Sequence, residues 1–236
     1  MVMNRNLDAD TVVEKVEILH QRIHERFPER NLTRLSADLC VLAQEARQTA
    51  AWIARPHTAL RVAIWGVIVV LVALIVAAFV GVSAPAGPID YAELVQVIEA
   101  AINDIILLGA TILFLLTAES RFKRHRALQA LHQLRSMAHV IDMYQLTKDP
   151  VRMLGSGPTT ASSPRVDLDA FQLTRYLDYC SEMLSFIGKI AALYVQDFDD
   201  GVALAAASEV QSLTTALSQK IWQKIMIINA MVMEGQ

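Results

Sequence analysis

The stretch Val62–Val82 reads VAIWGVIVVLVALIVAAFVGV and contains no charged side chain. A helix rises about 1.5 Å per residue, so these 21 residues cover roughly 30 Å, the thickness of the hydrocarbon core of a bilayer. A second apolar run, Ile105–Ala118, follows a short polar loop. The pattern predicts a transmembrane hairpin over residues 56–120, with spans at about 59–82 and 99–118.

The second span is less simple than the first. Ile105–Ala118 alone would reach only about 21 Å as a helix, so a full crossing requires the helix to extend back to Glu99. That extension draws Glu99, Asn103 and Asp104 into the outer third of the membrane. In the alternative, residues 91–99 form a helix on the outer surface, and the bilayer is locally thin.

Lysine and arginine near the ends of the spans predict the orientation of the hairpin. Arg47, Arg55 and Arg61 precede the first span and a basic cluster follows the second, whereas the connecting loop, 83–98, carries none. We therefore expect a multi-pass protein of the plasma (inner) membrane with both termini in the cytoplasm. The first span begins about 60 residues into the chain, which indicates a retained span and not a secretory signal.

The flanking segments carry apolar stripes at helical spacing and predict a cytosolic helical bundle. The fold class we expect is therefore all-α, an integral membrane protein built from a two-helix hairpin and this bundle. Its predicted parts are an N-terminal helical pair at 1–55, an extension of the second span at 121–147, a flexible loop at 148–166 and a C-terminal helical hairpin at 167–236.

Three local patterns add detail to the bundle. Thr11 and Glu14 have the spacing of a capping box for the first helix, and Asp167 can cap the first helix of the C-terminal hairpin. The stretch 221–233, IWQKIMIINAMVM, is apolar nearly all round and forms either the centre of the bundle or a contact between subunits. A strict 4-3 repeat predicts a coiled-coil-like seam of Leu173, Leu177, Cys180, Leu184, Ile187, Ala191 and Tyr194.

Composition and motifs narrow the class of function. The net charge of −3 gives no bias toward nucleic acid, and the two cysteines, Cys40 and Cys180, are expected to be reduced and buried. The sequence has no HExxH, GxSxG or CxxC motif and no glycine-rich phosphate loop. We therefore expect no enzymatic activity and no cofactor.

Polar residues of the second span are candidates for lining a pore. Gln96, Glu99 and Asn103 share one helical face, and Asp104 is adjacent. Carboxylates inside a membrane are costly and usually face a partner, a cavity or a pore, and a ring of them would suit cations. In the alternative, this segment lies at the headgroup level and its acids are in water.

Two further groups of residues can bind ions or lipid. Anionic lipid headgroups would be contacted by the basic residues Arg121, Lys123, Arg124 and Arg126. His139 and Asp142 are three residues apart and could share a metal ion, but a good helical site needs more ligands, so we predict no metal.

The sequence as a whole predicts a non-enzymatic two-span membrane protein. Its cytosolic bundle would mediate self-association, or binding of a cytosolic protein, at the inner membrane surface, so the expected partners are the lipid bilayer and further copies of the chain, without nucleic acid. The alternative is an oligomeric cation-conducting channel with the acids of the second span at the outer pore mouth. Two spans cannot enclose a pore, so this alternative also requires an oligomer.

Overall fold

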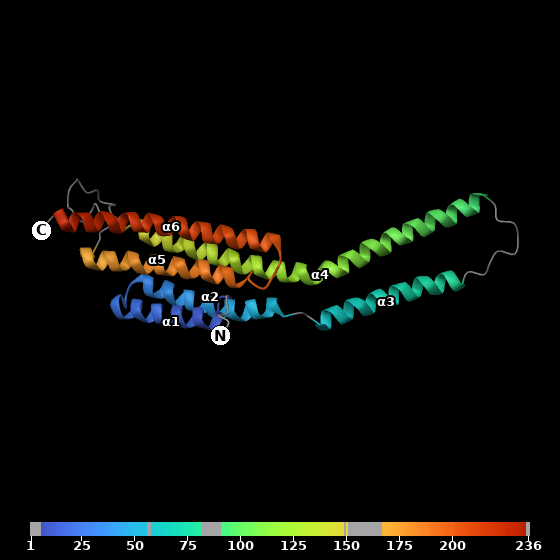
Figure 1. Ribbon diagram of the computed structural model, residues 1–236, viewed down its shortest axis with the longest axis horizontal. Coiled ribbons are helices and arrows are strands. Elements are labelled where there is room, and N and C mark those ends of the chain that lie inside the picture. Colours follow the sequence, from blue (N-terminus) through green and yellow to red (C-terminus); the bar gives the residue numbers. More distant parts are fainter. Residues whose placement is uncertain (1–5, 56–57, 82–90, 149, 151–166, 235–236) are drawn as a thin grey trace. The chain divides into compact units, whose positions relative to one another are not determined.

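The computed structural model is all-α, as predicted, and describes residues 6–55, 58–81, 91–148, 150 and 167–234 (Figure 1). The first part of the connecting loop, 83–90, and most of the predicted loop at 148–166 lie outside these residues. Within the described ranges there are no strands. The helices are α1 (Ala9–Arg26), α2 (Asn31–Ala54), α3 (Thr58–Gly81), α4 (Tyr91–Leu146), α5 (Ala170–Leu193) and α6 (Gly201–Glu234).

The chain divides into two compact units. The hairpin unit is Arg55–Lys123, and the bundle unit combines Met1–Ala54 with Arg124–Gln236. Helix α4 contributes to both units, because it runs without interruption for 56 residues. Residues 91–99, considered above as a separate surface helix, are part of this continuous helix.

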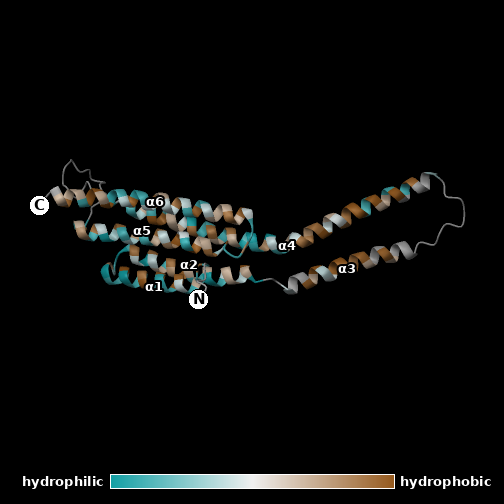
Figure 2. Cartoon of the chain, in the orientation of Figure 1, coloured by the Kyte–Doolittle hydropathy of each residue, from teal (hydrophilic) through white to brown (hydrophobic). Residues whose placement is uncertain are grey.

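The hairpin unit exposes large apolar side chains. Val69 on α3 and Phe114 on α4 are examples, and Figure 2 shows many hydrophobic residues along both helices. Among the residues that the structure describes, one helical stretch, Ile98–Leu146, is long and apolar enough to cross a membrane, and none of its most apolar window is buried. The described part of α3 contains a shorter apolar stretch, Val62–Ala73.

The bundle unit has a conventional core centred on α5, which contacts α1, α2 and α6. The 4-3 repeat on α5 is buried over its whole length, from Leu173 to Tyr194, as the periodicity predicted. Helices α1 and α2 add an apolar stripe each, with Ile23 and Leu39 fully buried. Helices pack in this way because each buries the apolar side of an amphipathic surface.

Two caps differ from the prediction. Helix α1 is capped by Asp8, whose carboxylate accepts the amide of Thr11, so Thr11 is the third helical residue and not the cap. Helix α5 is capped by Asp169, which forms a reciprocal capping box with Gln172, and not by Asp167. At both sites, two residues that could cap the helix lie within three positions of each other. The residue that caps is the one whose side chain accepts a backbone N–H of the first turn, which has no partner within the helix.

The apolar end of α6 divides its residues between two environments. Ile221, Ile225 and Ile228 are buried in the core of the bundle unit. Trp222 and Met226 lie about a third of a turn away on the same helix and are exposed. The two alternatives for this stretch, bundle centre or outer contact, therefore apply to different faces of one helix.

Candidate functional site

The exposed apolar side of α6 is the candidate interaction surface of the bundle unit. We call Trp222, Met226 and Met233 the α6 outer face; their exposed fractions are 57%, 62% and 78%. Their spacing of four and seven residues places them along one side of the helix. Aromatic residues and methionine are enriched in protein interfaces, whereas monomeric soluble proteins rarely leave such side chains together in solvent.

A buried polar contact fixes this end of α6 against α4. The Lys224 ammonium donates to the Gln145 main-chain carbonyl at 2.8 Å and to the Gln145 side-chain oxygen at 2.6 Å. The Gln145 amide in turn donates to Asp142 at 2.6 Å, and Gln145 is only 1% exposed. Because Gln145 is out of water, its bonds to Lys224 favour one register of α6 on α4.

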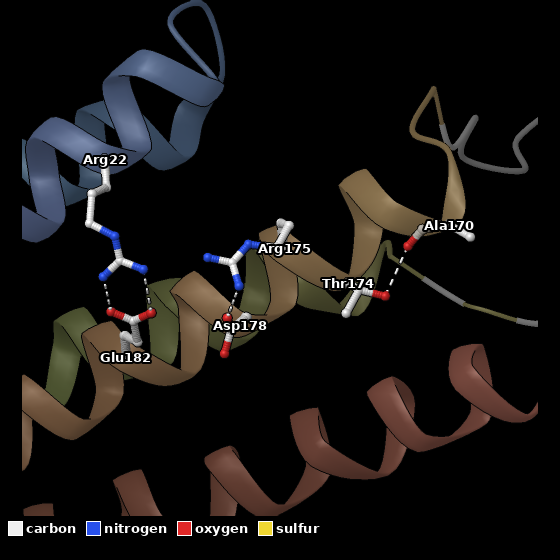
Figure 3. A network of polar contacts seen from close by, with 6 residues as sticks. All are labelled: Arg22, Ala170, Thr174, Arg175, Asp178 and Glu182. Atoms are coloured by element: carbon white, nitrogen blue, oxygen red, sulfur yellow. Dashed lines mark hydrogen bonds and ion pairs between the residues drawn. The ribbon is translucent and has the colours of Figure 1, made fainter.

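An ion-pair network ties α1 to α5 (Figure 3). Both terminal nitrogens of Arg22 donate to the Glu182 carboxylate, at 2.9 and 3.2 Å. Arg175 pairs with Asp178 at 2.7 Å, and the guanidinium groups of Arg22 and Arg175 both stack over the ring of Tyr179. The paired geometry raises the pKa of Arg22 through the Glu182 hydrogen bond. This network joins α1 to α5, while on α1 His24 is exposed and His20 is half-buried.

The predicted pore residues all lie on the part of α4 that belongs to the hairpin unit. Gln96, Glu99, Asn103 and Asp104 are exposed. The first three share one face of a regular helix, since they are three and four residues apart. Their role in a pore stays a prediction.

The first two members of the basic cluster contact other groups of the hairpin unit. Arg121 stacks over the ring of Phe114, 5.0 Å from its centre. Lys123 is buried, pairs with Glu119 at 3.0 Å and donates to the main-chain carbonyl of Arg55 at 2.9 Å. Lys123 therefore joins the residue that follows α2 to the middle of α4.

The other two members contact groups of the bundle unit. Arg124 binds Asp200, and Arg126 stacks over the ring of Trp52, 4.7 Å from its centre. The four residues thus make four separate contacts, and Lys123 is the one buried member. Contact of this cluster with lipid headgroups stays a prediction.

The weak metal candidates are not brought together with further ligands. His139 is exposed, and Asp142 accepts the hydrogen bond from Gln145 described above. Within the described residues, no three histidine, cysteine, aspartate or glutamate side chains are grouped as ligands of one ion.

The two thiols lie inside the bundle unit. Cys180 is fully buried, and Cys40 is half-buried with its sulfur 3.7 Å from the Val16 carbonyl. Burial raises the pKa of Cys40 to about 11 and that of Cys180 to about 12. Neutral thiols are poor nucleophiles and poor metal ligands, so neither is suited to catalysis.

The chain matches no protein-family model, no curated protein and no solved structure. What is known of this chain is therefore the structure of its two units. One contains apolar helices that expose their side chains, and the other is a closed helical bundle with an apolar outer face on α6.

Proposed function

We propose that this chain is a non-enzymatic integral membrane protein with two spans, whose cytosolic bundle self-associates at the inner membrane surface. The observation that carries the proposal is the contrast between the two units. The bundle unit buries its apolar side chains in a core of its own, whereas α3 and the first part of α4 present theirs outward. Lipid is the environment in which such outward apolar side chains are stable.

Length and charge support the two spans. Helix α3 has 24 residues, about 36 Å at the usual rise, and no charged residue follows Arg61 within it. Helix α4 supplies the second span from Ile98 onward. Arginines before α3 and after residue 120, with none in the loop between the spans, favour cytoplasmic termini.

The α6 outer face supports self-association. Its three members carry no charge, so a copy of the same surface can cover it without repulsion or unpaired charge. A two-fold contact between copies also suits membrane insertion, because both copies present their bundles on the same side of the bilayer. A cytosolic partner protein is the competing occupant of this face.

The mass of the detergent-solubilised particle, measured by light scattering or native mass spectrometry, tests this proposal. We expect an oligomer for the natural sequence and a monomer for the double variant Trp222→Ser, Met226→Ser. Leu204→Ser is the matched control, since Leu204 is equally exposed on the other end of α6. A monomeric natural chain would overturn self-association, and extraction of the chain from membranes by alkaline carbonate would overturn membrane integration.

A cation-conducting oligomer is the second candidate function. The observation that favours it is the set of polar side chains, Gln96, Glu99 and Asn103, exposed along one face of the apolar helix α4. Glu99→Gln should then lower the preference for cations over chloride in reconstituted bilayers, while Glu14→Gln on the bundle unit should not. Absence of conductance from the purified oligomer would exclude this function.

A further inference from the structure

Two histidines lie on adjacent turns of α1. His20 and His24 are four residues apart, and their rings are nearly parallel, at 28°, with centres 6.3 Å apart. An imidazole binds a divalent transition metal in the plane of its ring, at about 2 Å from the nitrogen, so one of these stacked rings must turn for both to bind one ion. Of the six histidines in the chain, these alone have the spacing of four residues that places two side chains on one helical face.

A buried hydroxyl selects the ring nitrogen that His20 can offer to a metal. The Ser36 hydroxyl donates to the Thr33 carbonyl at 2.8 Å, and the same oxygen is 2.8 Å from Nδ1 of His20. Ser36 is 1% exposed and has a single proton. Both contacts are hydrogen bonds only if Nδ1 of His20 carries a proton and donates it to Ser36, which leaves the lone pair on Nε2.

This arrangement is the one found around metal-binding histidines. Such residues usually donate their second ring N–H to a fixed acceptor, which orients the ring and sets its tautomer. Ser36 on α2 supplies that acceptor to His20 on α1. His24 is exposed and can turn toward the same point.

The local charges accept a cation. His24 lies in the last turn of α1, where the main-chain carbonyls favour positive charge. Arg22, between the two histidines, is directed to Glu182 on α5, and Arg26 lies over the ring of Phe171. Glu17, one turn before His20, adds a negative charge, although its carboxylate accepts a hydrogen bond from Gln44.

We infer that His20 and His24 form an open, two-ligand site for a borderline divalent cation on the surface of the bundle unit. Imidazole suits copper, nickel and zinc, and the general order of affinity places Cu²⁺ first. Water fills the remaining coordination positions, because closed structural sites need four protein ligands. This site is distinct from His139 and Asp142 and is independent of the proposed function.

Copper binding to the full-length protein in detergent, purified without a polyhistidine tag, tests the inference. Titration calorimetry should find one Cu²⁺ per chain, and electron paramagnetic resonance should detect two coordinating imidazole nitrogens. His24→Ala should weaken binding about 100-fold, since one ligand remains. The matched control is His139→Ala, an exposed histidine on α4, which should leave both readouts unchanged.

The role of Ser36 is tested separately. Ser36→Ala should weaken Cu²⁺ binding about tenfold, because the His20 ring loses its orienting acceptor. Affinity in His24→Ala equal to that of the natural chain would overturn the site. Unchanged affinity in Ser36→Ala would overturn the proposed tautomer of His20. His24 is exposed, so its substitution leaves the core of the bundle unit intact.

Discussion

The guanidinium of Arg124 on α4 lies 2.7 Å from the carboxylate of Asp200, the residue just before α6. The other oxygen of Asp200 accepts the amide of Ala203 at 3.0 Å, so one side chain caps α6 and also binds α4. The Asp200 side chain is only 6% exposed. Burial alone would raise the pKa of Asp200, but the Arg124 hydrogen bond, the Ala203 amide and the Arg124 charge outweigh it and hold the pKa below its usual value.

Asp200 should make the bundle unit sensitive to acid. Because its pKa is lower in the folded state than in the unfolded state, the ionised side chain stabilises the fold above about pH 4. That contribution is lost as the pH falls through the folded-state pKa. Asp200→Asn keeps the cap and loses the charge, so it should have a lower Tm at pH 7 and a smaller further loss below pH 4.

Circular dichroism of the detergent-solubilised protein, heated at a series of pH values, measures this effect. Asp200→Ala should cost about 1 kcal/mol more than Asp200→Asn at pH 7, because it also removes the cap. Asp199→Asn, an exposed neighbour, is the control. Identical acid profiles for Asp200→Asn and the natural chain would contradict the role of the charge.

The contact between Lys224 and Gln145 should be costly to break. Lys224→Met would leave the side-chain oxygen and main-chain carbonyl of Gln145 without this donor in a buried position. An unsatisfied buried acceptor costs about 1–3 kcal/mol, so we expect a clear fall in the midpoint of denaturant unfolding. Lys220→Met, at an exposed position on the same helix, should have no such effect. Equal midpoints for the two variants would show that solvent replaces the lost bonds.

Periodicity predicted α5 well and α6 only in part. Every third or fourth residue of α5 is apolar and the positions between are mixed, so only one face of α5 can form the buried stripe. The end of α6 is apolar on both sides, and the sequence alone does not distinguish the Ile221 side from the Trp222 side. The choice depends on the rest of the bundle unit, whose core includes the isoleucines and leaves Trp222 outside.

The basic cluster and the histidine pair show two different limits of prediction from the sequence. Consecutive helical residues are about 100° apart, so Arg121, Lys123, Arg124 and Arg126 point in different directions and meet different partners. The His20–His24 spacing was also visible in the sequence, but its acceptor, Ser36, comes from another helix, 16 residues away. Only the packing of α1 on α2 identifies it.

The core around α5 should tolerate no large cavity. Leu177 is fully buried, and Leu177→Ala should destabilise the bundle unit by about 2–5 kcal/mol, the cost of lost burial and an unfilled cavity. Leu204→Ala removes the same atoms from an exposed position and should change stability by less than about 0.5 kcal/mol. Chemical denaturation followed by circular dichroism gives both values. Similar losses for the two variants would place Leu177 outside the cooperative core.

The two thiols should differ sharply from free cysteine in their reactivity. With the pKa of Cys40 raised to about 11, about one molecule in a thousand is a thiolate at pH 8, and the fraction for Cys180 is smaller still. Cys40 is half-buried and should react slowly with a thiol reagent such as DTNB, whereas fully buried Cys180 should react only when the bundle unit opens. The single-thiol variants Cys180→Ser and Cys40→Ser separate the two rates. Both thiols should react at once in denaturant, and rapid labelling of Cys180 in the folded Cys40→Ser protein would mean that α5 leaves the core far more often than its complete burial implies.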